Sequence, residues 1–241
     1  MPQGLAPYRN MGILVVLVPG VMISDLSITC ASITESLGGN AAGVRDIARN
    51  TGFRLSNVEI SNCQDGILTF GSDIEIVGGY IHDNGSGTGQ THNIYVNGNG
   101  KNFFRLTHLH TANCKGGHEV KSRAAHTISF GCHHTTGGNG AAYDVPDGGQ
   151  LSISDGSMTL GAKAQDHVFV SYAMESTKNI GVGNIVTITN EVFNDGTGSG
   201  GIIQSGDPMA TLTLSDCTYT GSIRPQIKGW GAVNGSITKA V

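Results

Sequence analysis

The side chains that could do chemistry are concentrated between residues 82 and 148. They are His82, His92, Asn93, Tyr95, His118, Glu119, Lys121, Arg123, Tyr143, Asp144 and Asp147. Carboxylate and amide oxygens of this kind suit calcium better than zinc or copper. Histidine, lysine and tyrosine in the same segment can donate or accept protons. The residue types therefore indicate a site that binds a cation, transfers a proton, or does both.

A short repeated pattern supplies the elements that must position these groups. Each copy has an apolar residue, then usually a small or hydroxyl residue, then often Asp, Asn or Gly, and usually another apolar residue after two variable positions. The copies begin at Ile23, Leu55, Ile76, Leu106, Phe130, Ile153, Ile188, Leu214 and Val233. Asp, Asn and Gly tolerate the left-handed backbone conformation at which a strand can bend. Recurrence at coil-length intervals is typical of a solenoid.

The repeat predicts an all-β protein, a single-domain right-handed parallel β-helix of about nine coils. The domain should cover residues 1–241, with residues 1–20 as an irregular N-terminal segment and first strand. The composition agrees, because 37 glycines and 13% charged residues argue against helix bundles and coiled coils. The alternative is an antiparallel sandwich or jelly roll, in which Asn-Gly hairpins should join alternating strands.

A second apolar column lies between these anchors and predicts which side chains point outward. The column consists of Val44, Ile67, Ile94, Val120, Val145, Val170, Ile203 and Ile227. Because side chains alternate along a strand, the residue before each should face outward. This alignment puts Asn93, Glu119 and Asp144 in one row on three neighbouring coils, where their oxygens could share a calcium ion. Tyr95 and Lys121 should form the parallel row two positions along. The alternative is a polar ladder on a solvated face.

Lys121 and Arg123 are expected on the same face as Glu119, two and four positions along the chain. Beside a bound cation and Arg123, the pKa of Lys121 should fall, so that its amine could act as a base near neutral pH. His92 and His118 align in the preceding column. They either pack as a structural pair or take part in catalysis.

Several sequence runs resemble a known group of proteins. They are THNIYV (91–96), GHEVKSRA (117–124) and YDVPDGG (143–149), extended by NAAGVR (40–45) and DGILT (65–69). These runs resemble bacterial right-handed β-helix proteins of the pectate-lyase-like superfamily. The similarity covers about residues 40 to 150, and the rest of the chain only through the repeat.

A narrower similarity concerns the calcium-dependent polysaccharide lyases of the chondroitinase B and alginate lyase type. In that group a coil carries a glutamate followed by a Lys-Ser pair, an order that resembles Glu119, Lys121 and Ser122 here. The resemblance implies that Glu119 and Asn93 bind calcium and that Lys121 is the catalytic base. The implied substrate is an acidic, uronate-containing polysaccharide.

The sequence departs from that pattern at two places. This coil has one glutamate rather than two, with His118 beside it. Pro146 and Asp147 stand where an arginine is expected, so Arg123 is the nearest substitute. In the implied reaction, calcium neutralises the uronate carboxylate, the base removes the C5 proton, and Tyr95, Arg123 or a histidine protonates the leaving oxygen.

Charge, hydropathy and cysteine content limit the partners, membrane segments and disulfide bonds that we expect. A formal net charge of −4 without a basic cluster argues against nucleic acid. The apolar run over residues 11–23 is too short to span a bilayer and is interrupted by Pro19 and Gly20, so no transmembrane segment is expected. The five cysteines show no C-x-x-C pair, and we expect buried thiols without an intrachain disulfide.

Three functions follow from these observations. The first is a polysaccharide lyase or epimerase acting on an acidic glycan. The second is a non-catalytic glycan-binding or structural fibre, such as a phage tailspike or a cell-surface appendage. The third is a glycoside hydrolase that uses Glu119, Asp144 and Asp147. Each fits an extracellular, cell-surface or virion location, and the lack of evident end caps makes a homo-oligomer through the solenoid ends or side plausible.

Overall fold

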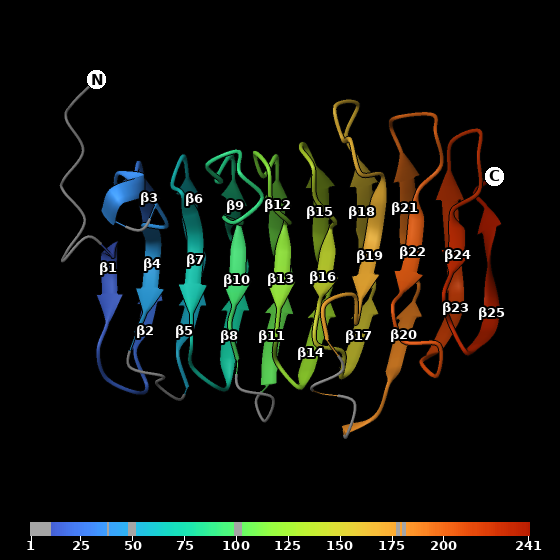
Figure 1. Ribbon diagram of the computed structural model, residues 1–241, viewed down its shortest axis with the longest axis horizontal. Helices are drawn as coiled ribbons and strands as arrows, with labels where there is room; N and C mark the ends of the chain where they lie inside the picture. The colour runs from blue at the N-terminus through green and yellow to red at the C-terminus, as the bar shows by residue number, and fades with distance from the viewer. Residues whose placement is uncertain (1–10, 38, 48–51, 99–102, 177–178, 180–181) are drawn as a thin grey trace.

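The computed structural model describes residues 11–37, 39–47, 52–98, 103–176, 179 and 182–241. Within these ranges the chain is almost wholly β-strand, and its single helical element is the 3₁₀ turn η1 (Glu35–Leu37). Every strand pairing there is parallel. The fold is therefore a right-handed parallel β-helix, as the repeat predicts (Figure 1).

One sheet, which we call the front sheet, faces the viewer in Figure 1. It takes one strand from each successive coil, so strands far apart in the sequence become neighbours. Its described strands, in spatial order, are β1 (Gly12–Val16), β4 (Ala42–Asp46), β7 (Asp65–Thr69), β10 (Ile94–Val96), β13 (Val120–Ser122), β16 (Tyr143–Val145), β19 (Val168–Tyr172), β22 (Ile202–Ser205) and β24 (Gln226–Lys228).

The second sheet lies behind the front sheet in Figure 1 and consists of two rows. The lower row is β2 (Met22–Ser24), β5 (Arg54–Ser56), β8 (Ile74–Val77), β11 (Phe103–Thr107), β14 (His126–Phe130), β17 (Gln150–Ser154) and β20 (Ile185–Thr189). The upper row is β3 (Ser27–Thr29), β6 (Glu59–Ser61), β9 (Tyr80–His82), β12 (His110–Ala112), β15 (His133–Thr136), β18 (Ser157–Leu160) and β21 (Val192–Asp195). The long strand β23 (Thr211–Thr220) belongs to both rows and pairs with β25 (Ala232–Lys239).

A column of left-handed residues forms the bend between the two rows. These residues, with φ between 49° and 63°, are Asp25, Asn57, Gly78, His108, Gly131, Asp155, Asn190 and Asp216. Asp, Asn and Gly predominate because they adopt this conformation at least cost. Neighbouring bends are also linked, since Asn57 Nδ2 donates a hydrogen bond of 2.9 Å to Asp25 Oδ1. The polar position of the repeat is thus what turns the chain.

The apolar anchors of the repeat form the predicted inward column at most coils. The register runs through Ile23, Leu55, Ile76, Leu106, Ile153, Ile188 and Leu214. Two of the predicted anchors are wrong. Ser129 replaces Phe130, which is 44% exposed, because the bend at Gly131 comes two residues after the anchor. Val233 pairs with Leu212, and Gly235 is the residue that pairs with the anchor Leu214.

The second apolar column is also confirmed except at one coil. Tyr143, not Val145, pairs with Val120 and Val170 in this column. The buried Tyr143 hydroxyl donates to Ser129 Oγ at 2.6 Å. A large tyrosine therefore accompanies a small anchor on the same coil, which keeps the interior filled.

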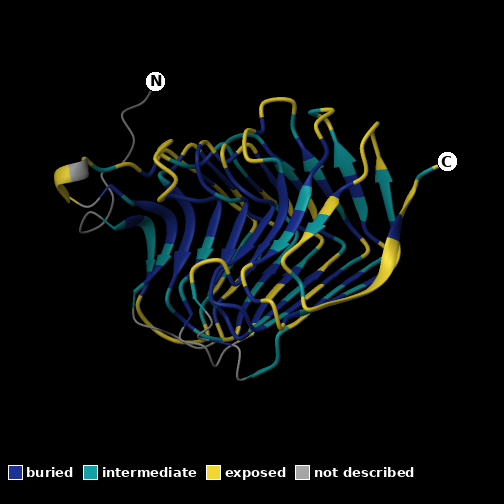
Figure 2. Cartoon of the chain, turned by 45° about the vertical axis from the view of Figure 1, so that its right-hand side comes forward, coloured by how far each residue is buried: buried dark blue, intermediate teal, exposed yellow. Residues whose placement is uncertain are grey.

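The core runs along the whole axis between the sheets, with exposed residues confined largely to loops and the C-terminal strand (Figure 2). All five cysteines are free thiols, as predicted, and all but Cys30 are buried. Among the described residues, no helix is long and apolar enough to cross a membrane. Residues 1–10 of the predicted N-terminal segment lie outside the described residues.

Candidate functional site

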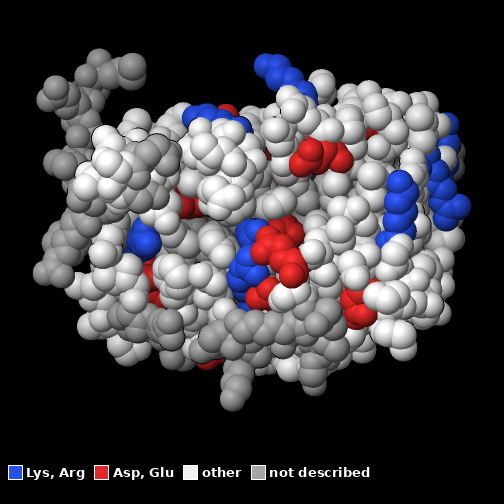
Figure 3. Space-filling view, in the orientation of Figure 1, with Lys and Arg blue, Asp and Glu red and all other residues white. Residues whose placement is uncertain are grey.

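The outward row of the front sheet brings together several of the predicted site residues. Tyr95 on β10 pairs with Lys121 on β13, and Lys121 pairs with Asp144 on β16. Figure 3 shows basic and acidic side chains gathered in the middle of this face. The row of Tyr95 and Lys121 is confirmed. The prediction that Asp144 shares the row of Glu119 is wrong, because Tyr143 takes the inward position next to Asp144.

Two cations and three carboxylates form a connected network in this row. Lys121 Nζ lies 3.1 Å from Asp144 Oδ2 and 2.7 Å from Glu175 Oε1. Arg123 Nη1 lies 2.6 Å from Asp147 Oδ1, and Arg123 Nη2 contacts Glu175 Oε2. The Glu175 carboxylate therefore bridges the ammonium and the guanidinium. Its side chain is 49% exposed, whereas those of Asp144 and Asp147 are 5% exposed.

Tyr95 lies against both cations. Arg123 Nε donates a hydrogen bond of 3.0 Å to Tyr95 Oη, and Lys121 Nζ lies 5.9 Å from the centre of the Tyr95 ring. The His92 ring meets Tyr95 edge-on, with 5.3 Å between ring centres. Because Tyr95 Oη accepts a hydrogen bond from a fixed cation, the phenol is well placed to exchange its proton with a ligand.

A polar cavity of about 330 Å³ opens at this network. It is lined by Gly89, Gln90, His92, Tyr95, His118, Lys121, Arg123 and Glu175. All five predicted catalytic residues therefore line one cavity. The cavity is bounded by the loop before β10, by β10 and β13, and by the segment after β19 that carries Glu175.

His92 and His118 form a stacked pair beside the cavity, with 5.1 Å between ring centres. His92 Nδ1 accepts a hydrogen bond from the backbone N–H of His118, and His118 Nδ1 accepts one from the backbone N–H of Ala141, both at 2.9 Å. Each ring proton therefore lies on Nε2, and His118 Nε2 is 3.2 Å from Asp144 Oδ2. Burial lowers the pKa of His92 to about 2 and also lowers the pKa of His118. Both rings are neutral and hold neighbouring coils together.

Lys121 is a cation rather than a base in this arrangement. Burial lowers its pKa, but the carboxylates of Asp144 and Glu175 outweigh burial and raise the pKa overall. The predicted fall in the pKa of Lys121 assumed a bound cation, and the two carboxylates act in the opposite direction. Burial raises the pKa of Glu175, but the hydrogen bonds from Lys121 and Arg123 outweigh burial. The pKa of Glu175 is therefore lowered overall, and Glu175 is a carboxylate. The site is held together by charges of opposite sign.

Asn93 and Glu119 lie inside the solenoid, contrary to the prediction that they face outward. Asn93 Nδ2 donates to Glu119 Oε2 at 2.5 Å and to the Ala112 carbonyl at 2.9 Å. Glu119 Oε1 accepts from the backbone N–H of Cys114 at 3.0 Å, and Asn93 Oδ1 accepts from Asn84 Nδ2 at 2.8 Å. Both side chains are buried. They precede β10 and β13 at a bend, where strand alternation no longer decides which way a side chain points.

The predicted calcium ligands do not fit a calcium ion. The Glu119 and Asn93 side-chain oxygens already accept hydrogen bonds from N–H groups. Asp144 lies elsewhere, beside the Lys121 ammonium and His118. In the described part of the chain, no group of three or more His, Cys, Asp and Glu residues is arranged to hold a metal ion.

Glu175 is the site residue that sequence reasoning does not find. It follows β19 and reaches residues more than 50 positions earlier in the chain. It belongs to no repeated position, and strand register does not specify where the side chains of loop residues lie. The available signal was weak: Glu175 is an isolated acid after a strand that stacks beside β16.

Comparisons of this chain with protein-family models, with curated proteins and with solved structures returned no match. The parallel β-helix therefore rests on the strand pairing itself.

Proposed function

We propose that this protein recognises an acidic, uronate-containing polysaccharide at Lys121 and Arg123. The observation that carries the proposal is the bridging contact of Glu175, whose carboxylate touches both cations in one cavity. A uronate carboxylate has the same shape and charge, and it can make the same two charge-assisted contacts. Glu175 is half-exposed, so it is the member of the network that a ligand can displace.

The same arrangement supports β-elimination, the chemistry of a polysaccharide lyase. Lys121 and Arg123 would neutralise the uronate carboxylate, which makes the C5 proton more acidic. Once its own hydroxyl proton has passed to solvent, the Tyr95 oxygen, held by the hydrogen bond from Arg123 Nε, would accept the C5 proton. The C4–C5 double bond forms as the C4–O bond breaks, and Tyr95 returns the proton to the leaving oxygen. No metal ion is needed for this sequence of steps.

With this activity, the parallel β-helix and the sequence runs that resemble the pectate-lyase-like superfamily favour membership of that group and action outside the cell. This assignment replaces calcium by two cationic side chains and the lysine base by Tyr95. An epimerase would share the proton abstraction and would return the proton to the opposite face of C5 without breaking the C4–O bond.

The test is a panel of polyuronates, followed by ultraviolet absorbance of the new double bond and by calorimetric binding. We expect Lys121→Ala to weaken polyuronate binding by about tenfold or more. Tyr95→Phe should retain binding and lose elimination, because only the proton-transferring oxygen is removed. Lys115→Ala is the matched control, since Lys115 is exposed and does not line the cavity.

The outcomes separate the alternatives. If no polyuronate binds the wild-type protein, the proposal is overturned. If polyuronates bind without any increase in absorbance, elimination is wrong and a binding or structural function stands. New reducing ends without absorbance would instead indicate a hydrolase, for which Asp144 and Glu175, both in contact with Lys121, are the candidate carboxylates.

A further inference from the structure

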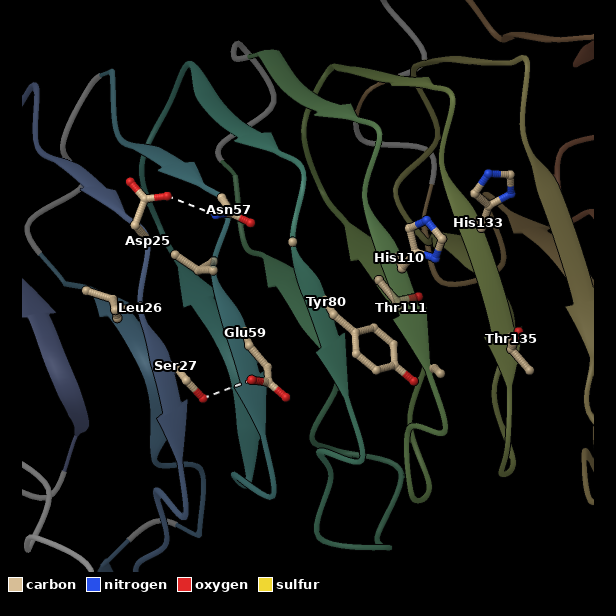
Figure 4. A pocket seen from close by; sticks show the side chains of 13 residues that line it. Asp25, Leu26, Ser27, Asn57, Glu59, Tyr80, His110, Thr111, His133 and Thr135 are labelled. Carbon is tan, nitrogen blue, oxygen red and sulfur yellow. Dashed lines mark hydrogen bonds between the residues drawn. The ribbon is translucent and has the colours of Figure 1, made fainter.

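A second concave surface lies on the upper row of the second sheet, away from the charged network. The groove has a volume of about 810 Å³. It is lined by Asp25, Leu26, Ser27, Asn57, Val58, Glu59, Gly79, Tyr80, His110, Thr111, Ala112, His133 and Thr135. Figure 4 shows that the labelled residues come from the neighbouring strands β3, β6, β9, β12 and β15 and from the bends just before β3 and β6. The groove therefore runs along the solenoid axis.

Aromatic rings form a row along this groove. Tyr80, His110 and His133 occupy the same register position on three neighbouring strands. All three side chains are exposed, and Tyr80 is 40% exposed. The His110 and His133 ring centres are 4.9 Å apart, and Tyr80 stacks on His82 with 4.0 Å between ring centres. Exposed flat rings held at fixed spacing can pack against the C–H faces of sugar rings.

Fixed polar groups lie beside the rings. Ser27 Oγ donates to Glu59 Oε2 at 3.1 Å, and His82 Nε2 lies 3.3 Å from Glu59 Oε1. The Asn57 amide is held by Asp25 at 2.9 Å. These contacts fix carboxylate and amide groups in place, so a ligand with many hydroxyls meets acceptors and donors that need little reordering.

The charge of the groove excludes an acidic ligand. Its lining includes the carboxylates of Asp25 and Glu59 and no Lys or Arg. A polyanion would meet like charge there, whereas a neutral polyhydroxylated chain would not. This is the opposite of the site on the front sheet, where two cations line the cavity.

We propose that this groove is a second carbohydrate site, which binds a linear neutral oligosaccharide along the solenoid axis. Neighbouring strands repeat at about 4.8 Å, which is close to the advance of one sugar in an extended pyranose chain. The five strands β3, β6, β9, β12 and β15 therefore span about 19 Å, enough for about four sugars. Tyr80 lies on the central strand and provides the main stacking surface.

The experiment measures binding of neutral oligosaccharides of two to eight sugars, with β-1,4-glucan, β-1,3-glucan, α-1,4-glucan and β-1,4-mannan chains at millimolar concentration, by calorimetry and chemical-shift perturbation. We expect at least one of these chains to bind, with an affinity that rises up to about four sugars and then levels off. Tyr80→Ala should weaken that binding by about tenfold, and Tyr80→Trp should preserve it.

Two control variants make the result specific. Phe103→Ala removes another aromatic side chain, 46% exposed, that lies outside the groove and should leave binding unchanged. Lys121→Ala should also leave neutral-chain binding unchanged, because this site is independent of the front sheet. Absence of binding by every neutral chain overturns the proposal. A wild-type dimer that Tyr80→Ala converts to monomers would also overturn it, because the groove would then be an interface between copies.

Discussion

On two neighbouring coils, side chains only two positions apart along the chain lie in opposite environments. Asn93 and Glu119 are buried and bonded to each other inside a corner of the coil. Tyr95 and Lys121, on the same two coils, line a solvent-accessible cavity. Each of these two short segments therefore contributes one side chain to the interior of the solenoid and one to the cavity.

The difference shows how a solenoid uses polar residues at a bend. Where a coil turns from one sheet to another, backbone N–H groups lose their strand partners and must find others. Glu119 supplies an acceptor for the Cys114 N–H, and Asp65 supplies one for the His92 N–H on the preceding coil. Within the straight strand, backbone partners are already present, so outward side chains such as Lys121 can pair with other side chains and line the cavity.

The largest expected effect comes from removing the buried acceptor. Glu119→Ala removes the acceptor of the Cys114 N–H and one of the two acceptors of the Asn93 side-chain amide, and we expect the free energy of unfolding to fall by about 3 kcal/mol. Urea unfolding measures the change. Glu75→Ala is the control, because Glu75 makes only partly exposed ion pairs with Arg54 and Arg105 and should lose less than about 1 kcal/mol. Equal losses in both variants would contradict the comparison.

A smaller effect should follow from pH. Burial raises the pKa of Glu119 from 4.5 to about 7 and that of Asp65 from 3.8 to about 7. The folded state thus holds protons that the unfolded state releases, and the corresponding stability is present below about pH 4 and is lost as pH rises through 7. We expect the melting temperature to fall over this window.

Glu119→Gln should flatten that fall, because an amide does not titrate. The matched variant Glu175→Gln should not, since the pKa of Glu175 is lowered by Lys121 and Arg123. A pH profile unchanged by Glu119→Gln would show that this carboxyl is not the titrating group.

The smallest effect concerns the carboxylate that a ligand would displace. Glu175→Gln removes the internal competitor for Lys121 and Arg123, so polyuronate affinity should rise by a few-fold, about 0.5 to 1 kcal/mol. Stability should change by less than about 1 kcal/mol, because the Glu175 side chain is half-exposed. This prediction rests on the proposed function, and calorimetry with the same polyuronate panel tests it. A weaker affinity in the variant would mean that Glu175 contributes to binding instead of competing with it.

Much of the fold could be predicted from the sequence because the repeat combines two physical signals. Apolar anchors such as Leu55 and Ile188 mark the interior, and Asn57 and Asn190 at the following bends mark the turn. The error at Phe130 comes from choosing the apolar residue instead of counting from the bend, whereas at Val145 the column is displaced by two positions to Tyr143, which is also buried. Counting from Gly131, which has a positive φ, puts Ser129 in the anchor column.

The candidate site was only partly predictable. Strand register places Tyr95 beside Lys121, because parallel neighbours repeat the same position on each coil. The direction of Asn93 and Glu119 could not be obtained from alternation, which applies inside strands and fails at the bends that precede β10 and β13.

The amino-acid sequence by itself determined the solenoid, the inward columns, the free cysteines and the clustering of chemistry on neighbouring coils. It did so because these features depend on local conformation and on a periodic pattern. Only the tertiary structure decided that Glu175 bridges Lys121 and Arg123, and that Tyr80, His110 and His133 line one groove. Loop paths and the facing of side chains across coils depend on packing between distant segments, which a periodic pattern does not specify.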